Sequence, residues 1–459
     1  MNCLIRPRSF PWHRLSVASL ALISTSVYAE LNFLGVAAGD VSDHDATVWT
    51  RAVDPAAPAS ASLTLEVSLD PTFGSGAMAL TDSTAANRDY TLKLDVTGLQ
   101  PSTVYYYRFV GPQAETSPIG RFKTAPKPTD NRPVHFAFSG DMDGLMRPYA
   151  LASTIPGQNL DFYVNVGDTI YETGSNPAGD AGLPQLNSPA VAASGAIPAP
   201  SATGATQAQL FADYSRKYRE QFLPVHLAGQ NSLKDFYAAQ GNYTLYDNHE
   251  LGNRQYINGG AAPGGPVGNM PSGAGVDARI ATNDVNTTGA FMNRAPGFLT
   301  LQQVYLNYQP VADRGIVTAP SDPRTDGTPR LYFSQQWGRN VIFINTDDRS
   351  YRDIRIKTAS NADDTGPRAA NPSRTMLGAT QLAWLEQTLL DAQKAGTPWK
   401  FVTVSDPIDQ IGPIGGALSG VVNSSGNPSY SPVSSDGGKS WIGGYRAERN
   451  ALLKFIADH

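Results

Sequence analysis

Cysteine is almost missing from this chain of 459 residues. The single cysteine, Cys3, stands near the N-terminus, ahead of a short apolar run. The rest of the chain can therefore form neither a disulfide bond nor a thiolate metal site. A lipid-modified cysteine would follow the apolar run rather than precede it, so we expect a soluble protein and not a lipoprotein.

Charged residues and long apolar runs are also scarce. Charged residues make up 16% of the chain, and the formal net charge is -5. Because such a chain has no basic field, we do not expect it to bind nucleic acid as a scaffold. The apolar run at residues 15–25 is shorter than the roughly 20 residues that cross a bilayer, and no later run is long and apolar enough. We therefore expect no membrane span.

The first 29 residues have the composition of a signal peptide. Arg6, Arg8 and Arg14 precede the apolar run, and the small residues Val27 and Ala29 stand at the cleavage positions. The alternative is a buried N-terminal helix. We expect residues 1–29 to be removed and the protein to be exported, either to the periplasm or as a secreted protein.

The length of the chain favours two domains. Within residues 30–126, β-forming stretches at 46–50, 62–68 and 103–109 alternate with Pro, Gly and Asp turns. This pattern predicts an N-terminal all-β sandwich similar to a fibronectin type III module. Pro126 and Pro128 give the following segment the composition of a linker.

The pattern changes over residues 131–459. Apolar runs typical of buried strands alternate there with helical stretches at 207–221, 378–394 and 445–459. This alternation predicts an α/β domain. Two long inserts, at 174–206 and 258–297, interrupt it, and loops of such length are usually functional lids or disordered.

Polar residues follow five of the predicted strands. In chain order they are Asp141 with Asp143, Asp168 with Tyr171, Asn248 with His249, Arg349, and Asp406. Because the carboxyl ends of strands in an open α/β sheet meet at one crevice, we expect these side chains to lie close together. Oxygen ligands with one or two nitrogens suit Mg, Ca, Mn or ferric iron.

Each of these short motifs, taken alone, is more often a turn or a helix cap than a metal site. Their order along the chain is more informative: Gly-Asp, then Gly-Asp-x-x-Tyr, then Asn-His-Glu, each after an apolar strand. This recurrence favours a hydrolase with a binuclear metal site, in which two metal ions activate a water molecule.

The motifs resemble those of the PhoD-like alkaline phosphatases over nearly all of the mature chain. The similar segments are 35–51, 105–108, 120–126, 167–172, 247–250, 347–352, 377–385 and 441–449. The resemblance implies an α/β metallophosphoesterase domain with two β-sheets flanked by helices. It also implies hydrolysis of phosphate monoesters or diesters with ferric iron and a divalent cation, calcium.

The resemblance further implies a role for each matching residue. Asp168 would bridge the two metal ions, Tyr171 would bind the ferric ion, and Asn248 would bind the second metal. His249 would lie over the phosphate and stabilise the transition state or the leaving oxygen. Arg349 would be either a phosphate contact or an ion-paired structural residue.

Two features depart from the family pattern. Ser139-Gly140-Asp141 stands where the family has a cysteine ligand, and Asp141 is more similar to the ligand of purple acid phosphatases; Asp143 is the alternative. The family's C-terminal Gly-Asp-x-His motif does not occur in the sequence. We therefore expect the catalytic domain over 131–459 to be C-terminally incomplete.

The sequence thus predicts an exported metal-dependent phosphoesterase that acts on small phosphate monoesters. One alternative is a phosphodiesterase, with phospholipase-D-like activity, on the same scaffold. The other is an exported adhesion or carbohydrate-binding protein without catalytic activity.

Overall fold

A computed structural model of the chain describes residues 30–55, 59–74, 76–144, 149, 152–171, 207–222, 233–251, 292–294, 296–353, 371–408, 441 and 445–459. The predicted signal peptide, residues 1–29, lies outside these ranges, as do the insert 174–206 and most of the insert 258–297. All statements about structure below concern the described residues.

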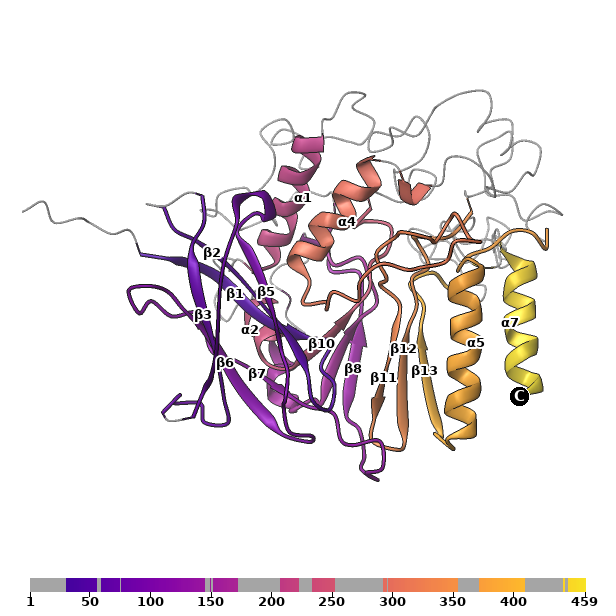
Figure 1. The fold of residues 1–459 in the computed structure, drawn as a ribbon, viewed down its shortest axis with the longest axis horizontal. Coiled ribbons are helices and arrows are strands. Elements are labelled where there is room, and N and C mark those ends of the chain that lie inside the picture. The colour runs from indigo at the N-terminus through magenta and orange to yellow at the C-terminus, as the bar shows by residue number, and fades with distance from the viewer. Residues whose placement is uncertain are drawn as a thin grey trace, which may run out of the picture.

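Seven strands and one short 3-10 helix form the N-terminal part. They are β1 (Asn32–Gly39), β2 (Ala46–Val53), β3 (Ser62–Ser68), β4 (Met78–Ser83), η1 (Ala86–Arg88), β5 (Thr91–Val96), β6 (Val104–Val110) and β7 (Gly120–Lys123). One sheet has the order β4-β3-β6-β7, and β1, β2 and β5 belong to a second sheet. The strands at the left of Figure 1 are these elements.

Strand β6 illustrates why these sheets pack together. Its buried residues Tyr105, Tyr107 and Phe109 alternate with more exposed ones, which places one face of the strand in the core. They join Val36, Val48 and other apolar residues of the second sheet in one cluster. The expected packing of two sheets is therefore present, and the closer likeness to a fibronectin type III module stays a prediction.

The second of these sheets extends beyond the N-terminal part. Its order is β5-β2-β1-β10-β9-β8, where β8 (Phe136–Ser139), β9 (Phe162–Asn165) and β10 (Gly241–Thr244) are parallel to one another. β1 pairs with β10 through Ala38 and Gly39. A Cβ at Gly39 would lie 2.1 Å from the carbonyl oxygen of Pro310, so only glycine fits there. The sequence did not predict this continuous sheet.

A three-stranded sheet faces the parallel strands. Its order is β11 (Phe333–Trp337), β12 (Val341–Asn345) and β13 (Trp399–Thr403), with β12 parallel to β13 and β11 antiparallel to β12. Phe162, Tyr243, Trp337 and Phe343 pack in one cluster between the two sheets. β12 and β13 agree with the predicted strands, whereas β11 was not predicted.

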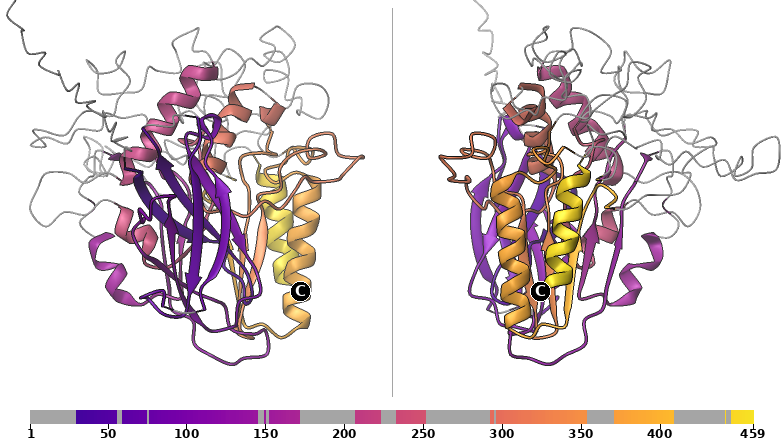
Figure 2. Two further views of the ribbon diagram at one scale, coloured as in Figure 1. Left: turned by 60° about the vertical axis from the view of Figure 1, so that its left-hand side comes forward. Right: turned by 90° about the vertical axis from the view of Figure 1, so that its right-hand side faces the viewer.

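Helices cover the outer faces of these sheets. They are α1 (Gln207–Phe222), α2 (Leu233–Ala238), α4 (Pro296–Tyr308), α5 (Ala379–Lys394) and α7 (Arg446–Asp458), and the short 3-10 helices are η3 (Ala152–Thr154), η4 (Pro156–Gln158) and η5 (Met292–Arg294). α5 and α7 lie side by side and pack on the β11–β13 sheet (Figures 1 and 2). None of the helices in the described ranges is both long and apolar enough to cross a membrane.

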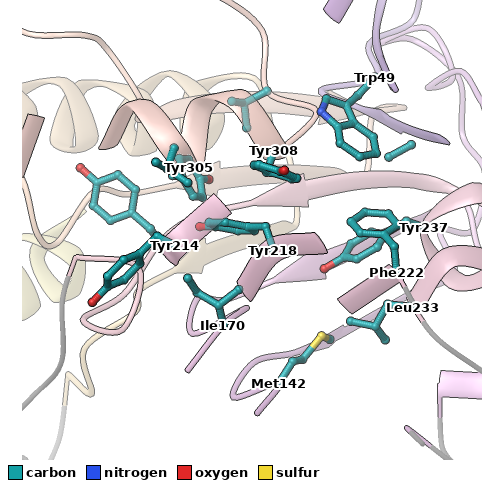
Figure 3. Close-up of a cluster of buried hydrophobic side chains, with 14 of the residues drawn as sticks. Trp49, Met142, Ile170, Tyr214, Tyr218, Phe222, Leu233, Tyr237, Tyr305 and Tyr308 are labelled. Atoms are coloured by element: carbon teal, nitrogen blue, oxygen red, sulfur yellow. The ribbon is translucent and has the colours of Figure 1, made fainter. Parts of the chain in front are cut away.

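α1 and α4 pack against the larger sheet through a cluster rich in tyrosine (Figure 3). Leu210, Tyr214, Tyr218 and Phe222 recur every four residues along α1, so they share one face of the helix. The Tyr218 and Tyr308 rings stack with centroids 5.1 Å apart. α1, α5 and α7 confirm predicted helices within about two residues at each end. α2 and α4 were not predicted.

Candidate metal centre at the strand ends

The parallel strands β8, β9 and β10 bring their carboxyl ends to one edge of the sheet. The turns after β8 and β9 hold each other: the Asp141 N–H donates to the Gly167 carbonyl at 3.2 Å, and the Met142 N–H donates to the Asp168 carbonyl at 2.8 Å. Asp141 and Asp168 have left-handed backbone conformations, with φ of 59° and 52°. Such conformations are uncommon outside glycine and cluster at functional sites.

Asp141, Asp168 and Tyr171 meet at this edge. The Tyr171 hydroxyl donates to Asp141 Oδ1 at 2.5 Å and to Asp168 Oδ2 at 3.1 Å. Oxygen atoms that share one ion at about 2.0–2.2 Å lie roughly 3 Å apart, so this spacing fits a common cation. The structure therefore brings together three of the four predicted metal ligands.

The pKa values of Asp168 and Tyr171 indicate that the cluster has too little positive charge around it. Burial and the Asp247 carboxylate raise the pKa of Asp168 well above its ordinary value. Burial and the Asp168 carboxylate raise the pKa of Tyr171. A bound cation opposes both effects because it stabilises the ionised forms. A donor set of two carboxylates and one phenol thus fits a hard cation.

Glu250 joins the turns that follow β9 and β10. Its carboxylate accepts the N–H groups of Asp168 at 3.0 Å, of Asp247 at 2.9 Å, and of Thr169. The side chain is 1% exposed. Burial raises the pKa of Glu250, and the backbone N–H groups oppose that rise. This carboxylate therefore fixes the backbone of Asp168 relative to the Asn-His-Glu turn.

His249 lies beside the three oxygen donors. Its backbone N–H donates to Asp168 Oδ1 at 2.9 Å, and its ring lies against the Tyr171 ring with centroids 3.8 Å apart. Asn248 is buried in the same turn. His249 therefore lies beside two of the predicted metal ligands, Asp168 and Tyr171. The roles of Asn248 in metal binding and of His249 in catalysis stay predictions.

Arg349 connects the two sheets. Its Nη2 contacts Asp247, which follows β10, and pairs with Asp406 Oδ1, which follows β13, at 2.7 Å. Arg352 pairs with the other Asp406 oxygen, also at 2.7 Å. Burial alone would lower the pKa of Arg349, but Asp247 and Asp406 outweigh it and the pKa is raised. Of the two expected roles for Arg349, these contacts favour the ion-paired structural one.

Some residues of the site were not given a role from sequence. The sequence assigns no function to Asp247 and Glu250, although both lie in the segment 247–250 that resembles the family. It places Asp406 after a strand but gives it no role. Asp143, the alternative to Asp141, is half-buried, and it is Asp141 that contacts Tyr171. Within the described ranges, no group of three or more His, Cys, Asp or Glu side chains is arranged to hold a metal ion. The binuclear site stays a prediction, and the described residues show one cluster of two carboxylates and a phenol.

Comparisons with known proteins give matches over most of the chain. A family model for the N-terminal domain of PhoD-like phosphatases matches residues 23–126, and the model for the PhoD-like phosphatase domain matches residues 135–459. Alkaline phosphatase D of Bacillus subtilis (strain 168) is 27% identical over 391 residues, which are 82% of this chain. The chain spans 58% of the length of that relative.

A solved structure described as "Structure of PhoD" has a similar fold. The TM-score is 0.63 at 23% sequence identity, and the match covers 93% of this chain and 69% of the other. At that identity the likeness establishes the fold. It agrees with the mixed sheets and flanking helices observed here.

Proposed function

Because this chain belongs to the PhoD-like phosphatase family, we propose that it is a metal-dependent phosphoesterase. One observation carries the proposal: oxygen atoms of Asp141, Asp168 and Tyr171 converge at the carboxyl ends of adjacent parallel strands. Carboxylates gathered in this way repel one another unless one of them takes up a proton or a cation lies among them, and a cation is the relief that keeps all of them ionised. The acidic turns are thus explained by a metal site better than by a binding protein without catalytic activity.

Two metal ions complete the proposed centre. A ferric ion would be held by Asp141, Asp168 and Tyr171, because a phenolate suits a trivalent ion. A divalent cation, calcium, would be held by Asn248 and share Asp168. When bound, such ions supply a water molecule of lowered pKa and positive charge for the phosphate oxygens.

The chain's own residues position the reacting groups. Glu250 holds the backbone of Asp168 and Asp247, so the ligand turns keep their spacing. His249, set against Tyr171, would donate a hydrogen bond from its imidazole to a phosphate oxygen or to the leaving oxygen. Arg349 keeps Asp247 and Asp406 at a fixed distance and so aligns the ends of the two sheets.

The proposed substrates are small phosphate monoesters. A phosphodiesterase would use the same cluster. The esters that the purified protein hydrolyses distinguish a monoesterase from a diesterase. We further propose that the protein is exported through its N-terminal 29 residues, which have the composition of a signal peptide.

The test compares two esters and two variants. Phosphate release from p-nitrophenyl phosphate and from bis(p-nitrophenyl) phosphate is measured together with the metal content of the protein. Asp168→Asn removes a charge that the cations share, and we expect it to lose metal and at least about 100-fold in activity. Asp391→Asn, the same change at an exposed position on α5, is the matched control and should change neither. An iron-loaded wild type that hydrolyses neither ester would refute the proposal.

A further inference from the structure

A cleft of about 1020 Å³ lies apart from the strand-end cluster, between η1 and β5 on one side and the end of α4 on the other. Its lining contains four cations, Arg88, Lys93, Arg314 and Arg330, and two carboxylates, Asp95 and Asp313. The cleft therefore has two more positive than negative groups, in a chain with a formal net charge of -5. We propose that it binds a small oxyanion: inorganic phosphate or the phosphate group of an organic ester.

Two arginines in the wall have hydrogen-bond donors that no described residue accepts. Arg314 pairs with Asp40, and Arg330 lies over the Tyr332 ring at 4.9 Å. Even so, Arg314 Nη1 and Arg330 Nε have no acceptor among the described residues, although they are buried from solvent. A guanidinium can only donate, so these two N–H groups stay without an acceptor, although the charge of Arg314 is paired with Asp40. In a poorly solvated wall, the unused donors and the charge of Arg330 raise the potential that an anion in the cleft would experience.

Lys93 adds a third positive group inside the cleft. Its Nζ donates to the Val311 carbonyl at 2.9 Å. Burial lowers the pKa of Lys93 to about 8, even though Asp40, Asp95 and Asp313 oppose that change. Burial disfavours the charged form of a lysine, and an anion beside the lysine stabilises that charged form. The interior of the cleft is therefore better suited to an anion than to a second cation.

The rest of the lining suits the carbon part of an ester. Leu306, Val311, Ile316 and Leu331 face the same cleft, and Ile316 is 67% exposed. A few charged groups surrounded by apolar side chains are typical of small-molecule sites. Arg88 is exposed, and among the described residues it is the cation of the lining most open to solvent.

The inner wall of the cleft is close to the strand-end turns. Arg314 and Leu331 also line a small cavity of about 10 Å³, together with Tyr246 and Asp347. A phosphate titration must therefore separate binding at the cleft from binding at metal ions. Metal-free protein achieves this, because phosphate would bind to the acidic strand-end turns only through metal ions held there.

The experiment is calorimetric titration of chelator-treated protein with inorganic phosphate and, separately, with glycerol 2-phosphate. We expect one site per chain. Lys93→Met and Arg88→Gln should each weaken binding by about tenfold, because each removes a charged partner of the anion. Lys127→Met and Arg132→Gln remove the same charges at exposed positions outside the cleft and should leave affinity unchanged.

The two titrations also distinguish a site for inorganic phosphate from a site for a phosphate ester. Similar affinities would show that the phosphate group alone is recognised, whereas tighter binding of the ester would assign a role to the apolar wall. If Lys93→Met lowers the melting temperature strongly, Arg88→Gln decides, because its side chain is exposed. No heat from either anion at millimolar concentrations, or equal affinity in the wild type and in Arg88→Gln, would overturn the proposal. Neither outcome depends on whether the protein is a phosphoesterase.

Discussion

Replacing Glu250 by glutamine would test whether the proposed metal ligands depend on a buried carboxylate that accepts backbone N–H groups. Glu250 Oε2 accepts the N–H groups of Asp168 and Asp247, at 3.0 and 2.9 Å, and Oε1 accepts that of Thr169. Glutamine has nearly the same shape but only one oxygen. If that oxygen keeps the position of Oε2, the amide NH₂ faces the Thr169 N–H, and two donors then oppose each other.

The cost can be estimated from these contacts. A buried N–H without an acceptor costs about 1–3 kcal/mol, and the other two hydrogen bonds lose their charge assistance, at roughly 0.5 kcal/mol each. The loss of a buried negative charge offsets part of this, because burial raises the pKa of Glu250. We expect a net destabilisation of about 2 kcal/mol. Metal affinity should fall by about 10- to 100-fold, as is typical when a group that orients ligands is removed.

Urea unfolding and a metal titration of the same preparation measure the two effects. Glu448→Gln is the matched control, because Glu448 is a buried carboxylate whose Oε1 accepts the N–H groups of Met376 and Leu377, at 2.9 and 3.0 Å, away from the strand-end cluster. The one oxygen that accepts both N–H groups survives the substitution, so we expect a smaller loss of stability and unchanged metal affinity. A Glu250→Gln protein that is destabilised but binds metal as the wild type does would refute the reasoning.

Three further predictions concern neighbouring residues. Tyr171→Phe should abolish the visible absorption of the iron-loaded protein, which a spectrum checks; an active, iron-loaded variant with an unchanged spectrum would rule out Tyr171 as the ligand. Asp406→Asn weakens buried ion pairs with Arg349 and Arg352 and should cost about 3 kcal/mol in urea unfolding. Burial and Asp406 raise the pKa of Asp348 from 3.8 to about 7. The folded state therefore keeps a proton that the unfolded state loses, and this contribution to stability falls as pH rises from about 4 to about 7. Unfolding of Asp348→Asn across that range should depend less on pH than that of the wild type.

The strand ends could be predicted because a local pattern determines them. An apolar run followed by Gly-Asp predicts a strand and a tight turn, and β8 and β9 end one and two residues before Gly140 and Gly167. Parallel pairing then brings Asp141 and Asp168 to one edge without further information. The nearness of these proposed metal ligands is thus a consequence of strand direction, which the alternation of strands and helices also indicates.

The continuous sheet could not be predicted in the same way. The pairing of β1 with β10 joins residues about two hundred positions apart, and no periodicity in either strand specifies its partner. The close approach depends on Gly39, which leaves room for the Pro310 carbonyl. α4 was missed for a related reason: its apolar face became evident only where Tyr305 and Tyr308 pack on the sheet.

Arg349 shows how tertiary contacts decide between roles that sequence leaves open. A phosphate contact and a structural ion pair require the same residue in the same motif. In the folded protein its guanidinium is 1% exposed and pairs with carboxylates from the ends of both sheets. Breaking a buried pair leaves an uncompensated charge and costs about 3–5 kcal/mol, more than the roughly 1.5–3 kcal/mol of a new hydrogen bond to a charged group. We therefore expect Arg349 to remain on Asp247 and Asp406 through Nε and Nη2 and so to hold the turn that contains His249, while its Nη1 has no acceptor among the described residues.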